Sequence, residues 1–283
     1  MQDNLNSKYK SIVDFLQMSS EIYFNETGIK VKIEIVNDFS FNARVSKIEE
    51  KVYKIEIRHG CLCLENLIEN ITNRYTEDDL KSFWRFRKLN IFEKNAGDTY
   101  REELNQLFGS IILLHIFFHE CGHITAKYID KENGTYAEMQ PSDNGGYEKQ
   151  EQEMVADWLS TKFLYKSMFF ATIGTDKIDF EELLSILEQL TILYWLSLTI
   201  EFQIFDSVHT GDVPDYSLLT HPHPAVRLYY SLDAMQECIL DIFNIYGFDD
   251  MQAEYGVEYI VNNIYILIES YLQITETPIS IKK

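Results

Sequence analysis

The chain has 283 residues, of which 46% are hydrophobic and 25% are charged, a composition typical of a globular protein with a buried core. Its 45 acidic residues outnumber its 25 basic residues and give a formal net charge of −20. Such a surface repels phosphate backbones and anionic lipid, which argues against nucleic-acid binding and membrane-surface binding. The charge leaves a neutral or cationic protein or peptide as the expected partner.

Three features of the sequence bear on where the protein works. The first ten residues are polar and lack the apolar core of a signal peptide, which argues against secretion. The most apolar runs, at 108–118 and 190–200, are shorter than a membrane-spanning helix requires. Four cysteines, two of them at Cys61 and Cys63, do not make a disulfide framework in a chain of this length. We therefore expect reduced thiols and a cytoplasmic protein that binds no membrane.

The N-terminal part is predicted to form a helix followed by a sheet. Residues 1–20 place apolar side chains along one helical stripe. Three later runs, at 29–35, 39–45 and 53–57, alternate apolar and polar residues with the period of a half-buried strand. Short polar turns separate these runs, and the pattern predicts an antiparallel meander.

The chain after about residue 62 is predicted to be mainly helical. One helix begins near Thr99, which has capping-box spacing to Glu102, and continues to about residue 128. Residues 131–147 hold three glycines, a proline and other turn formers, which predicts a loop. Helices follow at about 148–170 and 180–205.

Two histidine–proline dipeptides, at 221–222 and 223–224, break the chain before a helix that starts near Ala225. Pro224 suits the first turn of that helix, and a last helix is expected at 254–272. No repeat or linker marks a domain border. The sequence therefore predicts one α+β domain over residues 1–283, in which the helix and small antiparallel sheet of residues 1–62 pack on a helical body.

The most specific pattern in the chain is the H-E-x-x-H box at 119–123, inside a helix-forming run. Two imidazoles four residues apart lie about one turn apart on one helical face and can bind one metal ion. A carboxylate between them lies beside that ion, where it can activate a bound water. The box predicts His119 and His123 as zinc ligands and Glu120 as the general base of a peptidase.

A catalytic zinc usually has three protein ligands and an open fourth position for water. Glu153 is the best third ligand, because it lies 30 residues beyond the box on the next predicted helix, after a loop that can turn the chain back. Asp157, one turn further, can accept the free N–H of a ligating histidine and so orient its ring. Small Ala156 lets the two helices cross closely. Glu148 and Glu151 are alternative ligands if the helix register differs.

Other groups near the box are less suitable ligands. His115 lies about 12 Å along the helix from His123, too far for both to bind one ion, which favours a core or supporting role. Cys121 points away from the face that carries the histidines. Cys61 and Cys63 have no matching second pair, and we interpret them as packing residues.

These residues predict a mechanism. Zinc acidifies its water and polarises the scissile carbonyl, and Glu120 takes the water proton and passes it to the departing amine. A donor must also face the developing oxyanion. Zinc peptidases commonly bind substrate as an added strand along an exposed sheet edge. The candidate oxyanion donors are His221, His223, Arg227, Tyr136 and Tyr147.

The motifs resemble those of gluzincin metallopeptidases. H-E-x-G-H at 119–123, E-x-x-x-D at 153–157 and Thr-His-Pro at 220–222 with Arg227 downstream are similar, in the same order, to the pattern of the membrane-embedded CAAX prenyl peptidases. We expect this chain to lack that family's transmembrane helices. The resemblance implies a zincin-like fold, with Asp157 supporting the site and His221 and Arg227 supporting the oxyanion and the ligand carboxylates. The zinc ligands that it implies are His119, His123 and Glu153.

A soluble group of similar length and motif set, the phage-exclusion Lit-type peptidases, looks like the nearer relative. That resemblance implies a phage-defence protease that cleaves one host protein, elongation factor Tu, when infection triggers it. The glycine-rich loop at 131–147 is a candidate gate and favours regulation. The alternatives are a housekeeping peptidase, a non-catalytic interaction protein with structural zinc, and a helical scaffold that carries the box by accident.

Overall fold

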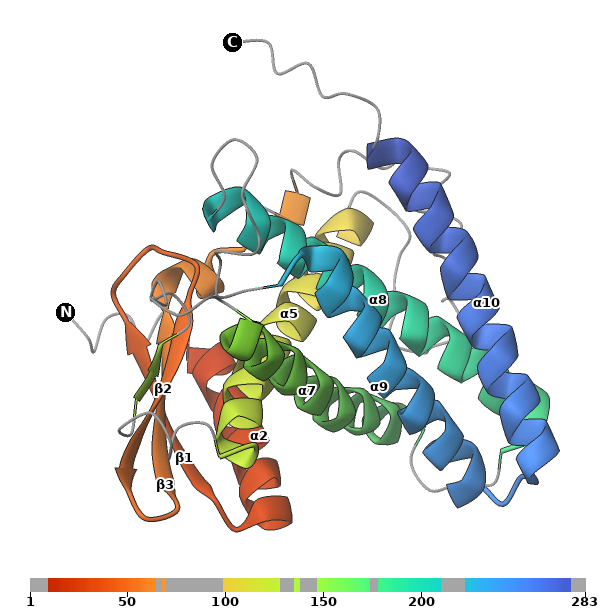
Figure 1. Ribbon diagram of the computed structural model, residues 1–283, viewed down its shortest axis with the longest axis horizontal. Coiled ribbons are helices and arrows are strands. Elements are labelled where there is room, and N and C mark those ends of the chain that lie inside the picture. The colour runs from red at the N-terminus through yellow and green to blue at the C-terminus, as the bar shows by residue number, and fades with distance from the viewer. Residues whose placement is uncertain are drawn as a thin grey trace.

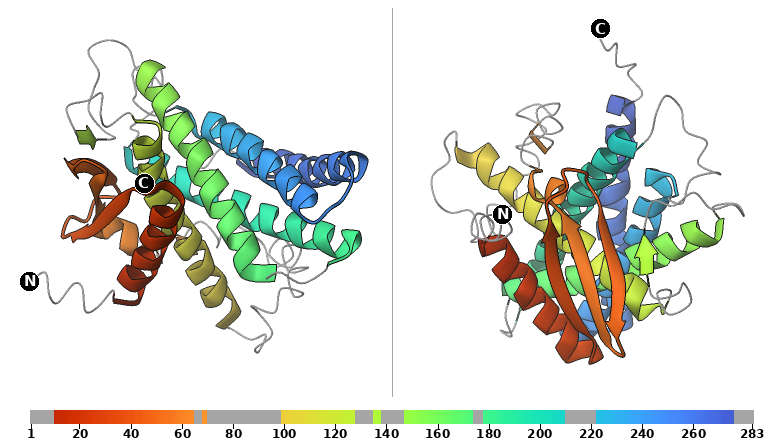
Figure 2. Two further views of the ribbon diagram at one scale, coloured as in Figure 1. Left: turned by 90° about the horizontal axis from the view of Figure 1, so that it is seen from below. Right: turned by 90° about the vertical axis from the view of Figure 1, so that its left-hand side faces the viewer.

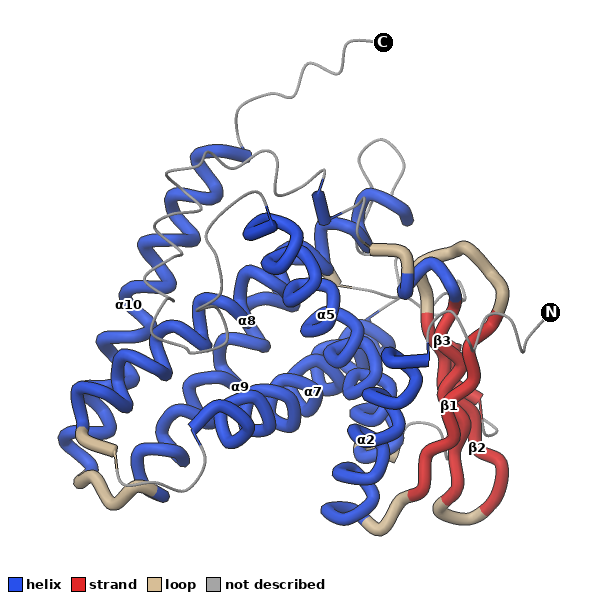
Figure 3. Tube along the Cα trace, turned by 180° about the vertical axis from the view of Figure 1, so that it is seen from behind, coloured by secondary structure: helices blue, strands red, loops and turns tan. Residues whose placement is uncertain are grey.

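The computed structural model is mostly helical with one small sheet, which confirms the predicted α+β class (Figure 1). The sheet lies at one end of the molecule, and the helices extend from it to the opposite end (Figure 3). The structure describes residues 10–64, 68–69, 99–127, 135–137, 147–173, 178–209 and 222–275.

The N-terminal elements agree with the prediction of one helix followed by strands. Helix α2 (Lys10–Thr27) is followed by β1 (Lys30–Val36), β2 (Ala43–Glu49), β3 (Val52–Arg58) and the 3-10 helix η1 (His59–Leu62). The helix expected over 1–20 therefore continues further than predicted, and residues 1–9 lie outside the described part of the chain.

The sheet has the strand order β1-β3-β2-β4 and is mixed, so the predicted antiparallel meander is wrong for β1. Strands β2 and β3 form an antiparallel hairpin, and Lys51 in its turn has a φ of 58°. Strand β1 pairs with β3 in parallel, with Ile33 opposite Ile55. Period-two alternation identifies the buried face of a strand, whereas it does not fix the direction of its neighbour.

The connection between β1 and β2 accounts for the parallel pairing, because it carries the chain past the end of β3. The Arg58 N–H donates to the Asn42 carbonyl at 3.1 Å, and the Gly60 N–H donates to the Asp38 carbonyl at 3.2 Å. A Cβ added to Gly60 would lie 2.3 Å from the Ser40 carbonyl oxygen. Glycine is thus required where the connection crosses the start of η1.

Strand β4 (Thr135–Ala137) pairs with β2 in antiparallel fashion. It falls inside the segment 131–147, so the prediction of a continuous loop is wrong for these residues. A three-residue strand is too short to give a period-two signal, which is why the sequence did not reveal it. Strands β1 and β4 form the edges of the sheet within the part of the chain that is described.

Five long helices form the rest of the described fold. The sequence predicted the start of each to within four residues and the end of each except α9, for which no end was predicted, to within four residues. They are α5 (Thr99–Thr125), α7 (Tyr147–Ile173), α8 (Phe180–His209), α9 (Pro224–Ile245) and α10 (Asp250–Thr275). Helix α9 begins at Pro224 as expected, and the Ala225 N–H donates to His223 Nδ1 at 3.1 Å. Helix α10 lies at the end remote from the sheet (Figure 1).

Helix α5 occupies the centre of the fold (Figure 2). It contacts the sheet through β2 and β3, and it also contacts α2, α7 and α8. Its side chains from 111 to 121 are all buried. A helix that is apolar on every side is expected in this position. The H-E-x-x-H box is consequently held on a rigid, buried element.

Two helical segments, Asn105–Thr125 and Phe180–Phe205, are long and apolar enough by length and composition to cross a membrane. The apolar runs noted in the sequence are only parts of these longer segments. Most of each segment is buried inside the fold, which core helices of soluble proteins also show. The finding is therefore weak evidence for a membrane protein.

Candidate metal centre

Helices α5 and α7 cross at Gly122 and Ala156. A Cβ on Gly122 would lie 2.8 Å from the Ala156 carbonyl oxygen and 2.9 Å from its Cα, so only glycine permits this separation. Ala156 itself is fully buried. The predicted close crossing at this alanine is confirmed, and it brings the H-E-x-x-H box of α5 against the E-x-x-x-D segment of α7.

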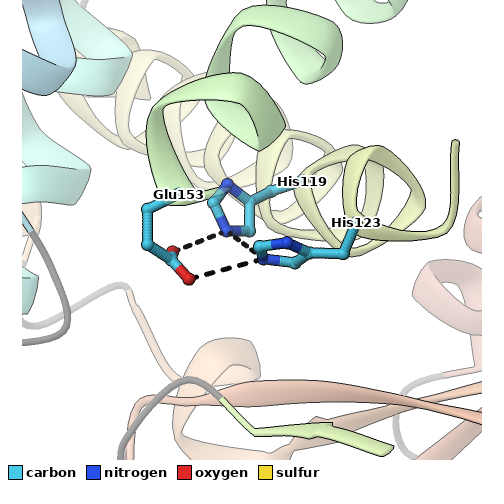
Figure 4. A group of neighbouring side chains, drawn as sticks. All are labelled: His119, His123 and Glu153. Atoms are coloured by element: carbon cyan, nitrogen blue, oxygen red, sulfur yellow. Dashed lines mark hydrogen bonds and ion pairs between the residues drawn. The ribbon is translucent and has the colours of Figure 1, made fainter. Parts of the chain in front are cut away.

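The crossing gathers His119, His123 and Glu153 into one group whose ligand atoms all lie within 4.8 Å of one another (Figure 4). His119 Nε2 lies 3.1 Å from His123 Nε2 and 3.1 Å from Glu153 Oε2. His123 Nε2 lies 3.6 Å from Glu153 Oε1. Ligands about 2.0–2.1 Å from a tetrahedral zinc are separated by about 3.3 Å, so the three edges fit one ion. The buried group can hold a metal ion.

The two histidines and the glutamate point from two helices toward a common point on the side of the sheet (Figure 4). All three are buried, with exposed fractions of 0–2%. The alternative ligand Glu151 is exposed and faces away from the group, and the side chain of Glu148 lies outside the described residues. The helix register of α7 thus places Glu153 in the group.

Asp157 contacts the other ring nitrogen of His119, as predicted. Its Oδ1 accepts from His119 Nδ1 at 2.8 Å, which leaves Nε2 directed at the Glu153 and His123 side chains. A carboxylate in this position fixes the tautomer and the rotation of a ligating ring. Burial alone would lower the pKa of His119, but Asp157 and Glu153 outweigh it and hold that pKa well above its ordinary value.

Arg227 forms a two-point ion pair with Asp157. Its Nε donates to Oδ2 and its Nη2 donates to Oδ1, each at 2.7 Å. The guanidinium also lies 4.3 Å above the ring of Phe202. Burial would raise the pKa of Asp157, yet Arg227 and His119 hold it below its ordinary value. The hydrogen bonds of Arg227 thus orient Asp157, and its charge also interacts with the ligand carboxylate of Glu153, as the resemblance implies. Its support of the oxyanion stays a prediction.

Glu120 lies on α5 between the two histidines and is fully buried. Its carboxylate, which directly follows the ligand His119 in the sequence, therefore lies in an environment from which bulk water is excluded. Cys121 is also fully buried, and burial raises the pKa of its thiol well above the ordinary value, with a smaller contribution from Glu120. A neutral buried thiol suits packing, in agreement with the prediction that Cys121 is no ligand.

Apart from Arg227, none of the predicted oxyanion donors is seen near His119, His123 and Glu153 in the described part of the chain. His221 lies outside them, as do the side chains of Tyr136 and Tyr147. His223 is exposed and caps α9, which is the turn-shaping role that histidines next to proline often have.

His115, one turn before His119 on α5, is paired with Glu201, a buried residue that the sequence did not indicate as part of the site. His115 Nδ1 is 3.0 Å from Oε1 and 2.9 Å from Oε2 of Glu201 on α8. His115 is fully buried and Glu201 is 4% exposed. An acidic residue at the end of the apolar run 190–200 was the available signal. His115 was predicted to have a core or supporting role, and its contact is with the Glu201 carboxylate.

None of the four cysteines forms a disulfide, and among the described residues the candidate metal-binding group contains neither Cys61 nor Cys63. Cys61 is buried and its Sγ donates to the Asn42 carbonyl at 3.3 Å. The packing interpretation agrees with this contact for Cys61, whereas Cys63 is exposed and does not belong to the core.

No protein family, no curated protein and no solved structure matches this chain.

Proposed function

We propose that the protein is a zinc-dependent endopeptidase of the gluzincin type with a zincin-like catalytic core. The observation that carries the proposal is the triangle of His119, His123 and Glu153, whose edges of 3.1–3.6 Å suit one tetrahedral ion with an open fourth position. Structural zinc sites are usually closed by four protein ligands, most often with cysteines. Three ligands and an adjacent glutamate favour catalysis.

The buried charges give independent support for a divalent cation. Glu120, Glu153, Asp157 and Glu201 are buried carboxylates, whereas Arg227 is the one buried lysine or arginine among the described residues. An uncompensated buried charge costs several kcal/mol, so a cluster this acidic favours a bound cation or bound protons. A zinc ion would supply two of the missing positive charges.

In the proposed reaction the chain's own residues perform separate tasks. A zinc ion held by the triangle would polarise the scissile carbonyl and acidify a water molecule. Glu120 would accept a proton from the attacking water and deliver it to the departing amine. Asp157 holds the His119 ring so that Nε2 faces His123 and Glu153, which together would hold the ion, and Arg227 holds Asp157 in place. The buried setting excludes bulk water and strengthens these interactions.

The resemblance of the motif order to the phage-exclusion Lit-type peptidases supports a narrower proposal. The protein would be a cytoplasmic, regulated protease that cuts one host protein, such as elongation factor Tu, with no nucleic-acid or membrane partner. The net charge of −20 is consistent with a protein substrate. A housekeeping peptidase would share the same site and differ in the breadth of its substrates.

One experiment tests the reaction and its breadth together. The parent protein and a Glu120→Gln variant are incubated with bacterial lysate, and new N-termini are mapped while the zinc content is measured. We expect both proteins to bind zinc and only the parent to cut. A single new terminus indicates a regulated protease, and a broad ladder indicates housekeeping. Equal cutting by the variant would show that Glu120 is not the base.

A non-catalytic zinc-binding interaction protein is the second candidate, and the burial of all three ligands favours it. The same experiment separates the two, because such a protein would bind zinc, gain thermal stability from it and leave the lysate uncut.

A further inference from the structure

We propose that His115 and Glu201 are positioning residues for the metal ligand His119, acting through Arg227 and Asp157. The inference rests on the proposed function, since it concerns the same metal site. It adds a set of residues to that site that neither the H-E-x-x-H box nor the E-x-x-x-D segment contains.

The first step is the position of Glu201 relative to Arg227. Both residues, together with His119, line one small cavity between the sheet and helices α5, α8 and α9. Burial opposes the charge of Arg227, yet Asp157, Glu153 and Glu201 together hold its pKa above the ordinary arginine value. Arg227 is thus hydrogen-bonded to the buried carboxylate of Asp157 and lines the same cavity as the buried carboxylate of Glu201.

The second step is the cavity itself. Its volume of about 10 Å³ suits one water molecule, which needs two to four polar partners to be held. The lining offers the Glu201 carboxylate, the Arg227 guanidinium and Asn42. The Asn42 Oδ1 atom is buried and makes no hydrogen bond to the described residues. A single water held there would link the Glu201 carboxylate to the Arg227 guanidinium, and the nearby Asn42 amide would be a further partner for it.

The third step is the anchor of Glu201. His115 contacts both oxygens of this carboxylate and is fully buried, so the carboxylate is held in one rotamer. The Ser160 hydroxyl donates to the His115 carbonyl at 2.9 Å, which ties this turn of α5 to α7. The chain of contacts therefore begins at His115 on α5 and returns to His119 one turn later. Four helices contribute to it.

The chain of contacts predicts a defined effect on the metal. Replacement of groups that orient a ligating histidine typically weakens metal binding by about 10–100-fold. Because Glu201 acts through two intervening residues, we expect the lower end of that range. We expect the ligand field to change as well, because His119 gains rotational freedom.

The test uses Co²⁺ as a probe that binds the same ligands and reports their geometry by its visible absorption. Cobalt affinity and spectrum are measured for the full-length parent, for Glu201→Gln and for Thr199→Val as a control. Thr199 is buried on the same helix and donates to the Trp195 carbonyl at 2.9 Å, so its loss probes stability alone. We expect a roughly tenfold weaker affinity and an altered spectrum for Glu201→Gln only.

The possible results separate this inference from the proposed function. Parental affinity and spectrum in Glu201→Gln would overturn the positioning role while leaving the metal site intact. A parent protein that binds no cobalt or zinc would overturn the proposed function and this inference with it. If Glu201→Gln does not fold, His115→Gln is measured instead, with the same expectation. Partial recovery of the affinity in Glu201→Asp would support a role for the charge.

Discussion

Gly122 and Ala156 touch backbone to backbone, and the ligand group depends on this contact. A methyl group on Gly122 would lie 2.8 Å from the Ala156 carbonyl oxygen, closer than van der Waals contact allows. We therefore expect Gly122→Ala to push α5 and α7 apart, to cost about 1–3 kcal/mol of stability and to weaken zinc binding strongly. Denaturant unfolding and zinc titration measure the two effects.

Gly109 is the matched control for that substitution, since it lies on the same helix. A Cβ there would contact only the Ile68 Cδ1 atom at 3.5 Å, an ordinary distance. Gly109→Ala should stabilise the helix by about 0.5–1 kcal/mol and leave zinc binding unchanged. Equal zinc affinity in both variants would contradict the importance of the Gly122 crossing.

Asp157→Asn tests the orientation of His119. The amide keeps the shape of the side chain but removes the charge that Arg227 and His119 share. We expect zinc affinity to fall by about 10–100-fold, as for other groups that orient ligating histidines. Asp241→Asn is the control, because Asp241 pairs with Lys166 on the surface at 2.7 Å. That variant should bind zinc as the parent does, and a parental affinity in Asp157→Asn would refute the orienting role.

Gly60→Ala tests why β1 runs parallel to β3. The added methyl group would lie 2.3 Å from the Ser40 carbonyl oxygen and 2.6 Å from the Phe39 carbonyl oxygen. Both are backbone atoms, so the connection 37–42 would have to shift to make room. We expect a loss of about 1–3 kcal/mol, or failure to fold. Urea unfolding measures it. A variant of parental stability would show that the connection moves freely at η1.

The site could be predicted from the sequence because its chemistry depends on helical periodicity. The spacing of His119 and His123 is that of one helical turn, and so is that of Glu153 and Asp157. Each pair therefore shares a face of its helix before any tertiary structure is known. Small Ala156 then indicates where two such faces meet, and the structure adds Gly122 as its partner on α5.

The remaining features depend on long-range contacts that no local pattern encodes. The parallel pairing of β1 with β3 follows from the path of a connection, and the alternation of Ile33 and Ile55 is the same in either direction. Glu201 belongs to the site because α8 packs beside α5, and nothing in its neighbouring residues indicates His115 as its partner. Arg227 was found by resemblance, while its actual partner Asp157 required coordinates.

The raised pKa of His119 predicts how zinc binding responds to pH. Because the pKa of the ring is higher in the folded than in the unfolded protein, protonation of His119 stabilises the metal-free fold. This stabilisation is complete below the unfolded pKa of about 6.5 and is lost as the pH rises through the folded pKa. We therefore expect His119 to carry a proton in the metal-free protein at neutral pH. Zinc must displace it, so binding should release about one proton at pH 7 and tighten as the pH rises.

Calorimetric titration of zinc in buffers of different ionisation enthalpy counts the protons released. Asp157→Asn provides the comparison, because it removes the nearer carboxylate from His119 and so lowers the pKa of the ring. This variant should release fewer protons at pH 7 even though it binds zinc more weakly. Weaker binding with an unchanged proton count would mean that Asp157 orients His119 without controlling its protonation. If the parent releases no proton, the His119 ring is neutral in the metal-free protein, and the buried carboxylates do not raise its pKa as we expect.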